Sequence, residues 1–248
     1  MSVGKYQSMT LEDYEDIMWT CVSCYCGLCV EGCPAYRVTL NEAYASRGLS
    51  QIGLAVLKKQ LDVKDIPDEM LFACTGCRWC EWNCSMNTPV YIVKHGNRMN
   101  KVSGATVAEL LRALRVESGV VPKEVKQALD NIVTHGNPYG IPKARKDKWV
   151  EELGLKLDGQ DTVFYVGATV PFEDRARAMA EAVIDVLRKG GVEFGMIGGD
   201  ELDSGAFARP FGEEGLFIEM VEHNLKSVSY THLRAHETEA DLVCRLLL

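Results

Sequence analysis

The sequence predicts an α+β protein of two domains, a mainly helical N-terminal domain followed by the start of an α/β domain. Nine of the ten cysteines lie between Cys21 and Cys84, where apolar residues recur at helical spacing. Further along, two short apolar runs flank a long amphipathic stretch, which is typical of a strand–helix–strand unit. We therefore expect a helical domain over 1–120, a helix and connector over 121–160, and a partial α/β domain over 161–228.

Three groups of apolar residues at helical spacing predict helices in and after the cysteine-rich part. The first group lies between the cysteine runs, the second follows a possible cap at Ser103, and the third follows Pro122. Their members are Leu49, Ile52, Gly53, Val56 and Leu57; Val107, Leu110, Leu111 and Leu114; and Val125, Ala128, Leu129 and Ile132. The charge-rich stretch 142–152 that follows is typical of a solvated connector.

The second domain is predicted from the runs at 162–166 and 192–197, which enclose an amphipathic helix at 173–189. We expect the buried face of this helix to carry Ala176, Met179, Ala180, Val183, Ile184 and Leu187. A strand, a helix and a second strand imply a parallel sheet. The stretch is shorter than a doubly wound domain of about 100 to 150 residues, so we expect an incomplete domain. Residues 229–248 resemble translated sequencing-adapter DNA, and we expect this tail, with Cys244, to be non-native.

Charge and hydropathy exclude several classes of protein. The formal net charge is −8, which disfavours a nucleic-acid partner because phosphate binding needs basic residues. No apolar run approaches the roughly 18 to 20 residues of a membrane span, and residues 1–16 lack the apolar core of a signal peptide. We therefore expect a cytoplasmic protein, held at the inner face of the membrane only through a partner if at all. Reducing cytosol does not sustain a disulfide framework, so the clustered cysteines indicate metal ligation.

The second cysteine run has the spacing of an iron–sulfur protein. Cys74, Cys77, Cys80 and Cys84 follow the pattern C-x2-C-x2-C-x3-C. In two-cluster ferredoxins the first three cysteines of such a run hold one cubane cluster, and the fourth ligates the other cluster.

The first run ends with the same spacing but begins irregularly. Cys26, Cys29 and Cys33 are followed by Pro34, whereas the regular pattern would place a further thiol at Ser23. Cysteines stand instead on either side, so one of Cys21 and Cys24 is expected to be the third ligand. The other would be a neighbouring thiol, and Cys24 is the first candidate for that place.

The cysteine count indicates two [4Fe-4S] clusters, since each needs four thiolates and the two runs provide nine. In the crossed arrangement, Cys33 completes the cluster built on Cys74, Cys77 and Cys80. Cys84 then completes the cluster built on Cys26, Cys29 and one of Cys21 and Cys24. Paired zinc sites with four thiolates each are the alternative. Typical zinc-knuckle spacings of about 15 to 20 residues do not fit the interval between Cys33 and Cys74.

The two runs and their surroundings resemble the iron–sulfur subunits of the heterodisulfide reductase type, which include subunits of glycolate oxidase and anaerobic glycerol-3-phosphate dehydrogenase. The resemblance covers roughly residues 10–227 through CGLCVEGCPAY, ASRG, LFACTGCRWCEWNC and GNPYG followed by Trp149. It implies a helical dicluster ferredoxin domain joined to an α/β domain of the CCG type. In heterodisulfide reductase, the cysteine-rich motifs of that second domain hold an unusual cluster that cleaves a disulfide.

This chain departs from the family pattern in the α/β domain. Ala168 stands where the family has the cysteine of Gly-Cys-Thr, and Asp203 and Ser204 stand where it has the cysteines of Cys-Cys-Gly. Alanine cannot bind iron, and oxygen donors suit a soft cluster poorly. The first motif is therefore expected to build no catalytic cluster.

We accordingly expect an electron-transfer subunit of an oxidoreductase complex, with no catalytic residue in this chain and no substrate turned over by it alone. The resemblance implies a flavoprotein or iron–sulfur oxidoreductase subunit as partner, together with a membrane cytochrome b or quinone-linked subunit. A catalytic disulfide-reducing subunit and a zinc-stabilised scaffold are the alternatives. We expect Trp79 and Trp82, which flank Cys80, to shield a cluster from water.

Overall fold

A computed structural model of the chain describes residues 9–87, 93–95 and 98–229, which form two compact units. We call residues 9–122 and 209–213 the cysteine unit, and residues 123–208 and 214–229 the second unit. Each is described by itself. The expected non-native tail lies outside the described residues except for Ser229. None of the helices in the described residues combines the length and the apolar character that a membrane crossing requires.

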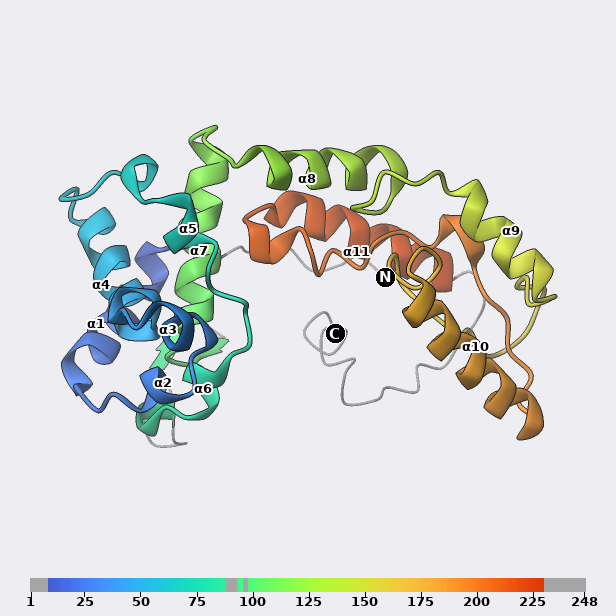
Figure 1. The fold of residues 1–248 in the computed structure, drawn as a ribbon, viewed down its shortest axis with the longest axis horizontal. Helices are drawn as coiled ribbons and strands as arrows, with labels where there is room; N and C mark the ends of the chain where they lie inside the picture. Colours follow the sequence, from blue (N-terminus) through green and yellow to red (C-terminus); the bar gives the residue numbers. More distant parts are fainter. Residues whose placement is uncertain (1–8, 88–92, 96–97, 230–248) are drawn as a thin grey trace. The chain divides into compact units, whose positions relative to one another are not determined.

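The cysteine unit is mainly helical. Its elements are α1 (Glu15–Cys24), α2 (Leu28–Glu31), α3 (Pro34–Thr39), α4 (Ser46–Leu57), α5 (Asp68–Leu71), α6 (Trp79–Trp82), the antiparallel strands β1 (Val93–His95) and β2 (Arg98–Asn100), and α7 (Gly104–Glu117). Short 3-10 turns connect them at Glu12–Tyr14, Glu42–Tyr44, Val63–Asp65, Ser85–Asn87 and Arg209–Phe211. In Figure 1 the elements from α1 to α7 are drawn from blue to green.

The core of this unit lies where α4 packs against both α1 and α7 (Figure 1). Its fully or nearly fully buried side chains include Ile17, Met18, Leu49, Leu54, Val107 and Leu111. Gly53 lets α1 and α4 approach closely, because a Cβ at this position would lie 2.5 Å from the sulfur of Met18. The expected cap of α7 is confirmed, since the Ser103 hydroxyl accepts a hydrogen bond of 3.3 Å from the amide of Thr106.

The second unit contains α8 (Lys123–His135), α9 (Ala144–Glu152), α10 (Asp174–Lys189), a 3-10 turn at Gly198–Asp200 and α11 (Glu214–Ser229). Its core forms where side chains of α9 and α10 meet the segment before the 3-10 turn. The buried members are Trp149, Val150, Leu155, Ala180, Ile184, Phe194 and Met196. The stretch 142–152 is therefore not a solvated connector, because α9 turns Lys146, Trp149 and Val150 into the interior.

The parallel sheet expected in the second unit is reduced to single bridges, so an α/β domain is not confirmed. Val163 pairs with Gly195 and Lys156 with Met196, both in parallel, but no named strand forms in the described residues of this unit. Gly167, with a φ of 74°, turns the backbone soon after the first bridge and limits the ladder.

The buried face expected for the amphipathic helix at 173–189 is only partly correct. Ala180 and Ile184 are buried in α10, whereas Met179 and Val183 are 64% and 45% exposed. The core of the described unit reaches only the face that contains Ala180 and Ile184, so apolar residues outside that face stay in contact with solvent.

A centre of clustered cysteines

The first cysteine run follows α1 through a sharp change of backbone direction. Tyr25 ends α1 in the left-handed conformation with φ 49°, and Gly27 follows with φ 70°. Cys29 lies within the short helix α2, and Cys33 directly precedes α3, whose first residue is Pro34. These turns bring cysteines that are close in sequence onto the same side of the unit.

The second run uses the same devices. Gly76 and Arg78 have φ values of 69° and 55°, and the one-turn helix α6 then contains Cys80. Cys84 follows α6 and directly precedes the 3-10 turn that begins at Ser85. The thiols of this run therefore leave the backbone in different directions.

The cysteines of both runs line two neighbouring pockets. The first pocket, of about 320 Å³ including the solvent at its mouth, is lined by Cys21, Cys24, Cys26, Cys29, Cys80 and Cys84. The second, of about 360 Å³ on the same basis, is lined by Cys33, Cys74, Cys77 and Cys80. Each pocket contains thiols from both runs, and Cys80 lies between the two pockets.

Two contacts outside the cysteines hold the runs together. The side-chain amide of Asn83 donates a hydrogen bond of 2.9 Å to the carbonyl of Leu28. The indole of Trp79 lies against Gly32, where an added Cβ would come within 2.1 Å of the ring. The residue before Cys33 and the residue before Cys80 are therefore in direct contact.

The two candidates for the irregular ligand have different surroundings. Cys21 is buried in the core, 3.6 Å from the hydroxyl of Ser46. Cys24 is half-buried; its thiol lies 3.2 Å from the carbonyl of Cys21 and 3.6 Å from the sulfur of Cys26. Both thiols line the first pocket, so geometry keeps both as candidates.

The protonation of these thiols is governed by burial. Desolvation raises the pKa of Cys21, Cys74 and Cys84, and it raises the pKa of Cys29 to about 12. Hydrogen bonding from the backbone amide of Leu28 lowers the pKa of Cys26. Crowded, desolvated thiols lose their protons readily only beside a strong positive charge, and metal ions supply such a charge. This set of thiols therefore fits soft metal centres such as iron–sulfur clusters. Within the described residues, no group of three or more His, Cys, Asp and Glu side chains is arranged to hold a single metal ion.

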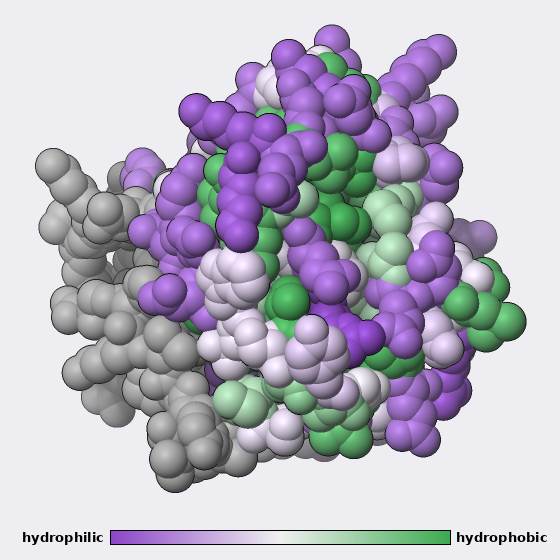
Figure 2. Space-filling model, turned by 90° about the vertical axis from the view of Figure 1, so that its left-hand side faces the viewer, coloured by the Kyte–Doolittle hydropathy of each residue, from purple (hydrophilic) through white to green (hydrophobic). Residues whose placement is uncertain are grey.

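The surface beside the runs is partly apolar. Figure 2 looks onto the side of the cysteine unit and shows apolar areas, in green, that interrupt a hydrophilic surface. Trp79 is 40% exposed and Trp82 is 81% exposed, so most of the Trp82 side chain is in contact with solvent, and the shielding of a cluster by the two rings stays a prediction. The ring of Trp82 faces solvent with the Lys101 ammonium 5.5 Å from its centroid.

Arg112 is a residue near the site that the sequence analysis missed. It is buried in α7, and its guanidinium donates a hydrogen bond of 2.8 Å to the carbonyl of Cys74. Burial lowers the pKa of Arg112, while the neighbouring Cys74 thiolate acts in the opposite sense. The signal in the sequence was an arginine on the same helical face as Ala105 and Ala108, which are also buried.

In the second unit, the three positions that depart from the family pattern carry no thiol. Ala168 is buried, a carboxylate oxygen of Asp203 accepts a hydrogen bond of 2.8 Å from the amide of Gly205, and the Ser204 hydroxyl accepts one of 3.3 Å from Ala206. Burial raises the pKa of Asp203. Asp203 and Ser204 therefore shape their loop by accepting hydrogen bonds from its backbone.

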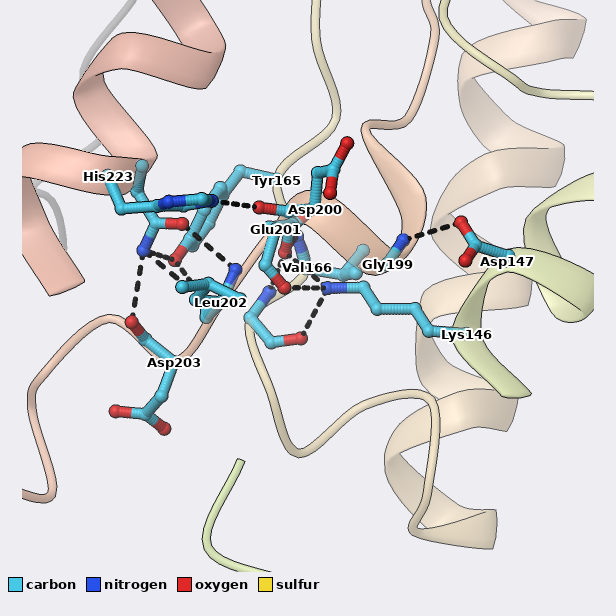
Figure 3. A network of polar contacts seen from close by, with 12 residues as sticks. Lys146, Asp147, Tyr165, Val166, Gly199, Asp200, Glu201, Leu202, Asp203 and His223 are labelled. Carbon is cyan, nitrogen blue, oxygen red and sulfur yellow. Dashed lines mark hydrogen bonds and ion pairs between the residues drawn. The ribbon is translucent and has the colours of Figure 1, made fainter. Parts of the chain in front are cut away.

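A buried ion pair joins α9 to the loops around these positions (Figure 3). The Lys146 ammonium lies 3.0 Å from one carboxylate oxygen of Glu201, and both side chains are almost fully buried. That oxygen also accepts hydrogen bonds from the amides of Val166 and Gly167, and Lys146 donates to the Gly167 carbonyl at 3.1 Å. The second carboxylate oxygen of Glu201 is buried and has no hydrogen-bond partner among the described residues.

Comparisons with known proteins agree with this geometry. Residues 18–88, which hold both cysteine runs, match the 4Fe-4S dicluster domain family. The chain is 26% identical to the EtfAB:quinone oxidoreductase of Syntrophomonas wolfei, covering 91% of this chain and 36% of that protein. It is 27% identical to the probable iron-sulfur-binding oxidoreductase FadF of Bacillus subtilis, over 64% of this chain and 22% of the relative. It is also 26% identical to one of the subunits of the dihydromethanophenazine:CoB--CoM heterodisulfide reductase of Methanosarcina mazei, over 82% of this chain and 50% of the relative.

The centre therefore defines a protein of the iron–sulfur class. The chain is similar to an iron-sulfur-binding oxidoreductase and to a heterodisulfide reductase subunit, in agreement with the resemblance seen in the sequence. It spans half or less of the length of these curated relatives. No solved structure gives a significant match to the chain.

Proposed function

We propose that this chain is an electron-transfer subunit of an oxidoreductase complex and that it relays single electrons through two [4Fe-4S] clusters. The observation that carries the proposal is the convergence of nine thiols from two runs on two adjacent pockets. When bound, each cluster accepts and releases one electron at a time. The matched domain and the relatives that are named oxidoreductases support this role.

The proposed ligands follow the crossed arrangement. Cys33 joins Cys74, Cys77 and Cys80 at the second pocket, whose cysteine lining consists of these four residues. Cys26, Cys29 and Cys84 hold the other cluster together with one of Cys21 and Cys24, and all five line the first pocket. Cys80 lines both pockets, and the spacing of the second run places it with Cys74 and Cys77.

The partners are proposed by chemical class. A flavoprotein or another iron–sulfur subunit would exchange electrons with the chain as one partner. A membrane cytochrome b or quinone-linked subunit would exchange them as the second partner. Relatives named quinone oxidoreductase and membrane-anchored ferredoxin support this assignment. Such complexes would place the chain in the cytoplasm, at the inner face of the membrane through its partner. Trp82 and Tyr25, which are 81% and 76% exposed beside the runs, suit a surface that a partner covers.

The test is the metal content of the full chain after anaerobic reconstitution. We expect about eight iron and eight sulfide per chain, with two interacting S = 1/2 signals in the EPR spectrum of the reduced protein. Roughly two zinc without sulfide would contradict the proposal and favour a scaffold.

Single serine substitutions then identify the irregular ligand. Cys21→Ser and Cys24→Ser are compared at equal protein concentration, because hydroxyl oxygen is a poor donor to a soft cluster. Substitution of the true ligand should lower the iron content by up to four per cluster-bearing chain, and substitution of the spare thiol should leave it unchanged. Retention of both complete clusters in both variants would contradict the assignment of the third ligand to this pair.

A further inference from the structure

Two buried arginines lie about one turn apart on α7 and have different surroundings. Arg112 is 4% exposed and Arg115 is 3% exposed. A guanidinium stays charged in proteins, so each burial must be compensated by hydrogen bonds and by a negative charge. The source of that negative charge differs between the two residues.

Arg115 is neutralised by a carboxylate of its own unit. It forms an ion pair with Asp68 and donates hydrogen bonds of 3.0 Å and 2.6 Å to the carbonyls of Val63 and Ile66. None of these partners belongs to the cysteine runs. Arg115 therefore has a complete set of partners away from the two pockets.

Arg112 donates hydrogen bonds to main-chain carbonyls. They are those of Leu71 at 3.0 Å, Cys74 at 2.8 Å and Pro210 at 2.8 Å. Within the described residues it forms no ion pair with a carboxylate. The acidic groups that act on its pKa are Cys74 and Glu109, and Glu109 already pairs with Arg78 at 3.5 Å. The Cys74 sulfur carries a negative charge only as a cluster ligand.

Two aromatic rings and the segment 209–213 shield the Arg112 guanidinium from solvent. It lies 5.0 Å from the ring centroid of Phe72 and 5.7 Å from that of Phe211, and the two rings stack with centroids 5.9 Å apart. Gly212 presses the same segment against α7, since a Cβ there would come within 2.6 Å of the Arg112 backbone. The charge therefore acts through a low-dielectric path with little screening by solvent.

We propose that Arg112 is a positioning residue that supplies the counter-charge for the cluster held by Cys33, Cys74, Cys77 and Cys80, and that it raises the reduction potential of this cluster above that of its neighbour. This inference rests on the proposed function. Reduction adds one negative charge to a cluster, and a fixed, buried positive charge beside a ligand stabilises that reduced form.

Among the described residues, no buried charged side chain lines the first pocket, whereas Arg112 adjoins the second pocket through its hydrogen bond to the Cys74 carbonyl. The arginine that lines the second pocket, Arg78, is partly exposed and paired with carboxylates. The arginine of the first pocket, Arg47, has a side chain that is 25% exposed and is paired with Glu42. The carboxylate and the solvent both weaken the effect of Arg47 on that pocket. At equilibrium, a single electron on the chain therefore resides mainly on the cluster beside Arg112, which gives the relay a direction.

The experiment is an anaerobic redox titration of the reconstituted full chain, monitored by EPR. Arg112→Gln removes the charge, Arg112→Lys retains it, and Arg115→Gln is the matched control from the same helix. We expect Arg112→Gln to shift one of the two midpoint potentials downward while the other stays in place. Arg112→Lys and Arg115→Gln should leave both potentials close to those of the unsubstituted chain.

Three outcomes would overturn the inference. They are unchanged potentials in a fully loaded Arg112→Gln protein, an equal shift of both clusters, or the same shift in Arg115→Gln. If Arg112→Gln loads too little iron to titrate, Arg112→Lys decides. A lysine variant that loads eight iron and keeps both potentials supports the charge, and one that also fails to load shows that Arg112 acts only through its hydrogen bonds. Failure of the proposed function would appear separately, as the absence of two clusters in the unsubstituted chain.

Discussion

At the scale of single residues, the contact between Gly32 and Trp79 controls how the two cysteine runs meet. The indole ring of Trp79 occupies the space that the Cβ atom of any other residue at position 32 would need. Neighbouring Asn83 adds the hydrogen bond to Leu28, so the two short helices α2 and α6 pack as one element. Small changes here should therefore act on both pockets at once.

The substitution Gly32→Ala tests this contact. Its Cβ would lie 2.1 Å from the Trp79 ring, which must move and carry Cys80 with it. We expect a loss of about 1 to 3 kcal/mol in the free energy of unfolding and reduced iron content after reconstitution. Chemical denaturation and iron analysis measure the two effects.

Gly215→Ala is the matched control, since a Cβ added at that position of α11 would meet no described atom within 4 Å outside its chain neighbours and the backbone of its own helix. It should leave iron content and stability close to those of the unsubstituted chain. Normal cluster loading in Gly32→Ala would show that the Trp79 contact does not position the runs.

At the scale of secondary-structure elements, the buried pair of Lys146 and Glu201 connects α9 to the loop after the 3-10 turn. Glu201 also receives the amides of Val166 and Gly167, so one carboxylate joins three segments of the second unit. Its second oxygen has no hydrogen-bond partner in the part of the chain that the structure describes, and burial raises the pKa of this carboxyl while it lowers the pKa of Lys146. Both pKa shifts favour the uncharged forms, which indicates that the cost of desolvating the two charges opposes their attraction for each other.

Lys146→Met should lower the free energy of unfolding far more than replacement of both partners does. The single change leaves Glu201 buried without its cation, and we expect a loss of about 3 to 5 kcal/mol in unfolding free energy. The double variant Lys146→Met with Glu201→Gln removes both charges and should recover most of this loss. A double-mutant cycle by urea denaturation measures the difference, and equal losses in the single and double variants would contradict it.

The pH dependence of the unsubstituted chain provides the second readout of this prediction. Because the pKa of Glu201 is raised from 4.5 on folding, the folded state binds more protons than the unfolded state above that value. The contribution of Glu201 to the unfolding free energy therefore falls as pH rises from 4.5 through the folded pKa. Glu201→Gln should remove this part of the slope.

At the scale of the whole molecule, the two units differ in their dependence on metal. The core of the cysteine unit includes Cys21 and packs against Cys74 and Cys84, so its apolar interior is continuous with the proposed ligands. The core of the second unit contains no cysteine among its described members. Cluster removal should therefore lower the stability of the cysteine unit selectively.

Scanning calorimetry of the chain before and after anaerobic treatment with an iron chelator tests this difference. We expect two unfolding transitions in the loaded chain, of which only one moves to lower temperature when iron is removed. The physical reason is that metal binding free energy contributes directly to the stability of the unit that holds the metal. Equal shifts of both transitions, or no shift, would contradict the separation.

Local signals in the sequence were sufficient for the helices α4, α7, α8 and α10 and for the class of the site, but they did not predict α9 within the charge-rich stretch 142–152. Apolar spacing placed α4, α7 and α8, Ser103 was recognised as a cap, and the two cysteine runs indicated iron–sulfur chemistry. The strands at 162–166 and 192–197 were not found, because a strand also needs long hydrogen-bonded neighbours, and here the pairing stops at single bridges. The crossed ligand assignment and the number of clusters remain predictions.

Residue type and short spacing are enough to predict which residues can bind a soft metal and where α4, α7, α8 and α10 form. Packing between distant segments brings particular thiols into one pocket, buries Arg112 beside Cys74 and turns Lys146 inward to meet Glu201. Each of these contacts joins residues far apart in the chain. Their energies come from burial and from the dielectric around a charge, which exist only once the units have packed.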